Sequence, residues 1–166
     1  MPRLELRAAT QDDLDLLWRF MAIAAYEPDA ASARAVPFVA AHLDGWMRPG
    51  DFGFVAETDG VAVGAAWVRQ FPPDDNPFYV DDRTAEVSVG VDAAMRGRGV
   101  GARLMNAVID EARRRGQGLC LNVRHDNPAR RLYEWLGFVL MPGVEVPNRV
   151  GGISLGMVLS GPARRG

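Results

Sequence analysis

The sequence contains no lysine, a single cysteine and only two histidines. All 19 basic residues are arginines, and 21 acidic residues outweigh them to give a net charge of −2. This balance provides no basic field for nucleic acid, so we expect no nucleic-acid partner. With Cys120 alone the chain cannot form an internal disulfide or a cysteine-based zinc cluster. His42 and His125 cannot make a metal site by themselves, so we expect metal-free chemistry.

The chain also has no apolar run near the roughly 20 residues needed to span a bilayer. The segment over residues 1–7 alternates charged and apolar residues and shows no apolar signal core. Apolar residues make up 48% of 166 residues, which is enough to build a core. We therefore expect one domain over residues 1–166, in a cytoplasmic protein with no membrane partner.

Apolar periodicity predicts a mixed α/β domain with a right-handed βαβ unit at its centre. Helices are expected after the capping box at 10–13, over 37–47, from 101 to 115 and over 127–135. Strands are expected at 4–6, 52–57, 61–68, 87–91, 119–123, 138–141 and 153–159, with an Asp59-Gly60 hairpin turn. Residues 71–82 contain three prolines and four aspartates, and we interpret this segment as a functional loop that closes over a ligand.

A glycine-rich turn, Arg96-Gly97-Arg98-Gly99-Val100-Gly101, lies between a predicted strand and a predicted helix. The backbone N–H groups at a helix start are unpaired and favour an anion, and glycines let a phosphate come close. The turn lacks the Gly-Lys-Ser/Thr ending of a nucleotide phosphate loop, and its glycine spacing differs from the dinucleotide pattern. The remaining candidate ligand for this turn is the pyrophosphate group of another cofactor. The alternatives are an ordinary flexible turn and an arginine-glycine tract for RNA.

Two motifs resemble one family. Val89-Gly90-Val91-Asp92 followed by the turn at 96–101 resembles the pyrophosphate-binding signature of the GNAT N-acetyltransferase superfamily. The segment over 127–138 resembles the family's second signature, and 86–91 is similar to the phosphinothricin acetyltransferase-like branch. The resemblance covers essentially the whole chain. It implies an α+β fold whose mostly antiparallel central sheet has about seven strands, with helices on both faces and a splayed parallel strand pair.

The resemblance also implies acetyl-CoA as the acyl-donor cosubstrate. In the family, the backbone of one strand contacts the pantetheine arm, and the glycine turn binds the pyrophosphate. Asn127 is equally a good helix N-cap in any protein. Carried over to this sequence, the expected cofactor-binding residues are Val89, Gly90, Val91, Arg96, Gly97, Arg98, Gly99, Val100, Gly101, Asn127 and Arg130.

Two residues match catalytic positions of the family. Tyr133 matches the phenol that protonates the leaving thiolate, and its alternative role is core packing. Glu86 matches the acid that deprotonates the incoming ammonium, either directly or through a water; its alternative is an edge or solvent-facing glutamate. Cys120 sits in an apolar strand run with no histidine fixed beside it, so we interpret it as buried filler and not as an acyl-accepting nucleophile.

These residues together predict an N-acetyltransferase that transfers acetyl from acetyl-CoA to a primary amine of a small molecule. The transfer is expected to be direct, within a ternary complex. The alternatives are a non-catalytic acyl-CoA sensor and an enzyme that acetylates a protein or peptide amine. Because the family often pairs into dimers, a homodimer is a candidate assembly.

Overall fold

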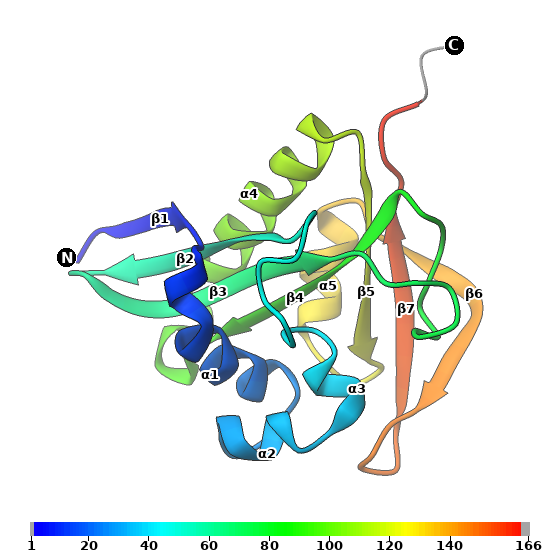
Figure 1. Cartoon of the computed structure of the whole chain (residues 1–166), viewed down its shortest axis with the longest axis horizontal. Coiled ribbons are helices and arrows are strands. Elements are labelled where there is room, and N and C mark those ends of the chain that lie inside the picture. The colour runs from blue at the N-terminus through cyan, green and yellow to red at the C-terminus, as the bar shows by residue number, and fades with distance from the viewer. Residues whose placement is uncertain (1, 164–166) are drawn as a thin grey trace. The chain divides into compact units, whose positions relative to one another are not determined.

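The computed structural model describes residues 2–163 as a mixed α/β chain, as the sequence predicts (Figure 1). Within these residues the strands are β1 (Leu4–Ala8), β2 (Phe52–Thr58), β3 (Val61–Arg69), β4 (Thr84–Val91), β5 (Gly118–Arg124), β6 (Val139–Pro147) and β7 (Ile153–Leu159). The helices are α1 (Leu14–Ala24), α2 (Ala30–Arg34), α3 (Pro37–Ala40), α4 (Val100–Arg114) and α5 (Ala129–Trp135).

The strands form one seven-stranded sheet in the order β1-β2-β3-β4-β5-β7-β6. The pairs β1–β2, β2–β3, β5–β7 and β6–β7 are antiparallel, and β4–β5 is parallel. The parallel ladder consists of three residue pairs, from Thr84 with Gly118 to Glu86 with Cys120. The predicted fold class, a mostly antiparallel sheet with one parallel pair and helices, is therefore confirmed.

The chain divides into two compact units. Unit 1 comprises residues 1–69 and 88–108, and unit 2 comprises residues 70–87 and 109–166. β4 and α4 each contribute residues to both units. The predicted single domain over residues 1–166 stays a prediction.

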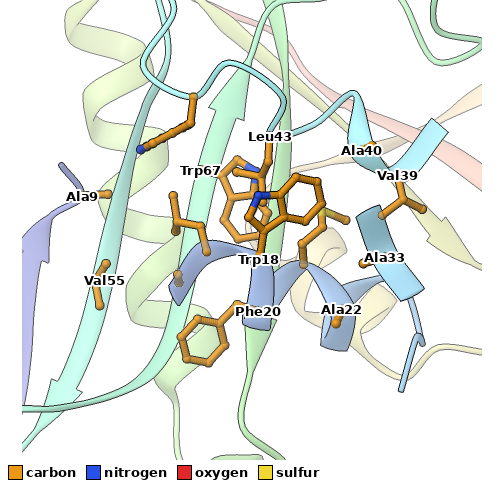
Figure 2. Packing of buried hydrophobic residues seen from close by; sticks show 14 of the residues in the cluster. Ala9, Trp18, Phe20, Ala22, Ala33, Val39, Ala40, Leu43, Val55 and Trp67 are labelled. Carbon is orange, nitrogen blue, oxygen red and sulfur yellow. The ribbon is translucent and has the colours of Figure 1, made fainter. Parts of the chain in front are cut away.

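Unit 1 has its core between α1 and the strands β2 and β3 (Figure 2). Helix α1 buries one face, with Leu17, Trp18, Phe20 and Met21 at most 6% exposed. The strands contribute Val55, Ala65 and Trp67, which are all at most 1% exposed. Burying side chains of this size supplies the main stabilisation of such a unit, because each large apolar side chain contributes about 1.5–3 kcal/mol.

The predicted capping box caps a single 3-10 turn over Gln11–Asp13, which leads directly into α1 at Leu14. The Thr10 N–H donates to Asp13 Oδ2 at 2.7 Å, and the Asp12 N–H donates to the Thr10 hydroxyl at 3.3 Å. Arg7 of β1 donates two hydrogen bonds of 2.8 Å to the Asp13 carboxylate. These bonds lower the pKa of Asp13 and tie the first strand to the first helix.

The helix predicted over 37–47 is wrong in its length. α3 ends at Ala40, and turns follow it to Gly45. Arg69 of β3 explains the early end, because its Nη1 binds the carbonyl oxygens of Ala41 (2.8 Å) and Asp44 (2.7 Å). Gly45 then adopts a φ of 68°, which a continuing helix does not allow. The short helix α2 before α3 was not predicted, although Asp29 is its N-cap and accepts the Ser32 N–H at 2.8 Å.

Arg69 also forms a buried ion pair with Asp51. Its Nη2 and Nε donate to the two carboxylate oxygens at 2.7 and 3.2 Å. The two side chains are 3% and 2% exposed. The pair therefore clamps the segment between α3 and β2 onto β3.

Unit 2 is built on the antiparallel strands β5, β7 and β6 with α5. Leu119, Leu121 and Val123 of β5 and Met157 of β7 are buried. β6 is longer than predicted and shifts its register on β7 between Leu140 and Glu145. In the described part of the chain, no helix is both long and apolar enough to cross a membrane.

Candidate active site

Residues 96–99 of the predicted glycine turn lie in unit 1 between β4 and α4, whereas Val100 and Gly101 are the first two residues of α4. Gly97 and Gly99 have φ values of +74° and +79°, and nothing lies within 4 Å of where a Cβ would be. The backbone conformation, and not crowding, is thus what requires glycine here. The Arg103 N–H donates to the Gly99 carbonyl at 3.1 Å, so α4 begins immediately after the exposed turn. A helix start that follows an exposed glycine turn can bind a phosphate through its unpaired N–H groups.

The second half of β4 holds Val89, Gly90 and Val91. Both valines are partly buried and Gly90 is fully buried. A Cβ on Gly90 would lie 2.3 Å from the carbonyl oxygen of Phe20, a separation that real structures do not show. Gly90 therefore lets α1 pack directly on β4. Sequence reasoning missed this packing role, since it depends on a helix 70 residues earlier.

Glu86 lies at the last pair of the parallel ladder, in unit 2. Its side chain is 3% exposed, so the alternative of a solvent-facing glutamate is excluded. Asn122 Nδ2 donates to Glu86 Oε1 at 2.7 Å, and Asn76 Nδ2 donates to Glu86 Oε2. Each carboxylate oxygen thus accepts an amide N–H. A buried carboxylate with this pattern of donors is held in one orientation.

Sequence reasoning missed both asparagines. Asn76 lies in the proline-rich loop and carries no distinguishing signal there. Asn122 is the polar residue inside the apolar run Leu119–Val123, and its position in a buried strand is a signal that could have been used.

Tyr133 is buried in α5, 8% exposed, and packs edge-to-face on Phe138 with ring centroids 6.2 Å apart. The Asn127 side chain accepts the Ala129 N–H at 2.9 Å at the start of this helix. Arg130 pairs with Glu134 at 3.0 Å one turn further on. The catalytic role of Tyr133 and the cofactor contacts of Asn127 and Arg130 stay predictions.

Cys120 is buried and is the ladder partner of Glu86. Burial raises the pKa of its thiol, and the negative charges of Glu86 and Asp81 raise it further. The nucleophile in cysteine chemistry is the thiolate, so this environment suppresses nucleophilic catalysis by Cys120. Within residues 2–163, no cluster of three or more His, Cys, Asp or Glu side chains could hold a metal ion.

The described strands form a mostly antiparallel sheet with one parallel pair, and the glycine turn precedes α4. The sequence profile of the acetyltransferase (GNAT) family matches residues 15–138. The chain belongs to the acetyltransferase (GNAT) family. This confirms the family resemblance predicted from the two motifs.

Two curated relatives agree with the predicted branch of the family. YwnH of Bacillus subtilis (strain 168), provisionally named a phosphinothricin acetyltransferase, is 34% identical over 96 residues, covering 55% of this chain and 57% of that protein. The L-methionine sulfoximine/L-methionine sulfone acetyltransferase of Salmonella typhimurium is 37% identical over 97 residues, covering 55% of this chain and 54% of that protein. The matched region thus spans little more than half the length of these relatives.

A solved structure matches nearly the whole chain. The ribosomal-protein-alanine N-acetyltransferase from Brucella melitensis aligns with a TM-score of 0.71 and 27% identity, covering 94% of this chain and 99% of that chain. The names of these similar proteins include small-molecule and protein acetyltransferases, so family membership leaves the acceptor open.

Proposed function

We propose that this protein transfers the acetyl group of acetyl-CoA directly to a primary amine of a small molecule, with Glu86 as the general base. The observation that carries the proposal is the environment of Glu86, which is buried and accepts one amide hydrogen bond on each oxygen. A protonated amine cannot attack a thioester, so the reaction needs a group that removes the proton. A carboxylate held with both oxygens as acceptors is suited to that task.

The cofactor assignment is supported by the glycine turn and by family membership. Residues 96–99 are exposed directly ahead of the start of α4 and include two arginines, Arg96 and Arg98. These are the groups that a pyrophosphate requires. Further back along β4, the backbone of Val89 and Val91 would align the pantetheine arm of acetyl-CoA.

In the proposed reaction, Glu86 accepts a proton from the ammonium, either directly or through a water. The free amine nitrogen then forms a bond to the thioester carbonyl carbon, and the carbon–sulfur bond breaks. Tyr133 donates its phenolic proton to the departing thiolate, for which a phenol is an acid of suitable strength. The new amide nitrogen then releases its second proton, which restores the Tyr133 phenol. Most of the rate gain would come from alignment, since holding two bound reactants in place removes about 7–11 kcal/mol of barrier.

The small-molecule acceptor is supported by the curated relatives, one of which is named for free amino-acid analogues. The acidic residues of the 71–82 loop would attract a cationic acceptor. Arg149, an exposed residue in the turn between β6 and β7, would pair with an acceptor carboxylate, which favours amino-acid analogues over polyamines. Acetylation of a protein amine is the second candidate, because the Brucella melitensis protein is named for that activity.

An acceptor panel tests the proposal. Thiol release from acetyl-CoA is measured with free amino acids, polyamines, aminoglycosides, peptides and folded proteins at equal concentration, and mass spectrometry identifies the products. We expect the highest kcat/KM with a small amine. Peptides or proteins as the best acceptors would refute the small-molecule assignment. Tight acetyl-CoA binding without turnover on any acceptor would indicate a non-catalytic sensor.

A further inference from the structure

The centre of the 71–82 loop is anchored to unit 2, contrary to the interpretation of this segment as a loop that closes over a ligand. Asn76 and Phe78 are only 5% and 1% exposed. The preceding residues 72–75 of the same loop are exposed. Burial of this degree in a loop requires a specific set of partners for the polar side chain. Those partners are Glu86 and the loop's own backbone.

The orientation of the Asn76 amide is determined by its hydrogen bonds. Its Oδ1 accepts the Phe78 N–H at 2.8 Å, which forms an Asx turn. The side of the amide opposite Oδ1 therefore carries the NH₂ group, which is a hydrogen-bond donor. That NH₂ group donates to Glu86 Oε2. A flipped amide would lose both bonds, so the turn itself directs the donor at the carboxylate.

The turn is held against the sheet by Phe78. A Cβ built on Gly156 of β7 would lie 3.2 Å from Phe78 Cδ1, so the phenyl ring lies on the strand where a side chain is missing. Gly156 is the register partner of Asn122 on β5, and Asn122 donates to Glu86 Oε1. The anchored turn and the second amide donor are therefore supported by the same strand pair.

We infer that Asn76 is a positioning residue for Glu86, through which the loop keeps the carboxylate ionised and correctly oriented to receive the proton of the amine. This inference rests on the proposed function. Two amide donors on separate oxygens favour the charged form of a buried carboxylate and restrict its rotation. The titratable group that pairs with Glu86 on the neighbouring strand is the Cys120 thiol, whose raised pKa keeps it neutral, so it adds no charge beside Glu86. The 71–82 loop thus acts as a fixed part of the catalytic machinery.

The test replaces the donor and keeps the turn. Asn76→Asp retains an oxygen that accepts the Phe78 N–H but sets a second carboxyl beside Glu86. Because like charges disfavour ionisation, we expect the ionisation midpoint of Glu86 to rise by about one pH unit or more. Carbon NMR of the side-chain carboxyls measures this midpoint, and Glu86→Gln assigns the signal. The acid limb of kcat/KM should move to higher pH by the same amount, with KM for acetyl-CoA unchanged.

Asn106→Asp is the matched control, since it makes the same chemical change at an exposed position on α4. It should leave both the midpoint and the pH profile of the wild type in place. Asn76→Ser keeps a hydroxyl oxygen for the Phe78 N–H and adds no charge. It provides the test if Asn76→Asp does not fold, and it should lower kcat and raise the acid limb without changing KM for acetyl-CoA.

An unchanged Glu86 midpoint in a folded Asn76 variant would overturn the inference, whatever the turnover. The proposed function fails by a different result, namely full turnover in Glu86→Gln. A variant that loses stability but keeps the wild-type midpoint would show that Asn76 is only a packing residue, which also overturns the inference. The NMR measurement needs no acceptor, so it decides the role of Asn76 even before the substrate is known.

Discussion

Gly90 offers a quantitative test of how unit 1 is assembled. Its α-carbon faces the carbonyl group of Phe20, and a Cβ would lie 2.3 Å from the oxygen and 3.0 Å from the carbonyl carbon. In Gly90→Ala, either α1 or β4 must move by about 0.7 Å before the oxygen reaches even the 3.0 Å limit seen in real structures. Both groups are backbone, so neither can rotate away.

Overpacking of this kind typically costs about 1–3 kcal/mol. Replacing glycine by alanine also reduces the entropy of the unfolded chain, which returns about 0.4–1 kcal/mol. Because the clash is between backbone groups, the upper half of the overpacking range applies, and we expect a net loss of about 1–2.5 kcal/mol in the free energy of unfolding. This corresponds to a Tm lower by roughly 2–10 °C for a chain of this length. Urea denaturation and thermal scans measure both quantities.

The matched control is Gly64→Ala on β3, where a Cβ would meet its nearest neighbours at 3.1–3.2 Å and two of them are side-chain atoms that can yield. Its loss should be clearly smaller. Equal stability of Gly90→Ala and wild type, or a larger loss in Gly64→Ala, would refute the packing argument. Weaker acetyl-CoA binding in Gly90→Ala at unchanged stability would instead assign this glycine to the cofactor alone.

Three further predictions address the other parts of the account. Tyr133→Phe should lower kcat by about 10²–10⁴-fold while acetyl-CoA binding is kept, because only the hydroxyl is lost; an unchanged chemical step in rapid-quench kinetics would make Tyr133 a packing residue. Gly99→Val should abolish acetyl-CoA binding in calorimetry, whereas Gly50→Val, at another uncrowded glycine with positive φ, should leave it intact; equal binding in both variants would disprove the phosphate assignment. Arg69→Met should destabilise the protein by about 3–5 kcal/mol in urea titrations, since Asp51 would stay buried without its partner, and a loss below about 1 kcal/mol would contradict this.

Local signals in the sequence were sufficient for much of the fold. The Asp59-Gly60 pair predicts a hairpin, and the two residues have φ values of 50° and 75°. The run of arginines over 113–115, followed by Gly116, predicts the end of α4, and Gly116 has a φ of 70°. Each of these features depends on residues close together in the chain, so a local pattern is enough to predict it.

The network around Glu86 could not be predicted in the same way. Asn76 and Asn122 lie 10 and 36 residues from Glu86 in sequence. Only the buried turn at Asn76 and Phe78 and the pairing of β4 with β5 bring these asparagines to the carboxylate. The family resemblance pointed to Glu86 as a base but contained no information on what holds it. The cofactor contacts and the homodimer are still predictions, because they involve molecules beyond this chain.

The most direct test of the central claim is the pH dependence of kcat/KM for acetyl transfer by wild type and Glu86→Gln. The control is Glu145→Gln, which removes an exposed carboxyl of the same unit. We predict that the wild type and the control lose activity as acid protonates the base, and that Glu86→Gln is slower by about 10²–10⁴-fold and lacks this acid limb. Glu86→Gln with wild-type turnover and an unchanged acid limb would contradict the assignment of Glu86 as the general base.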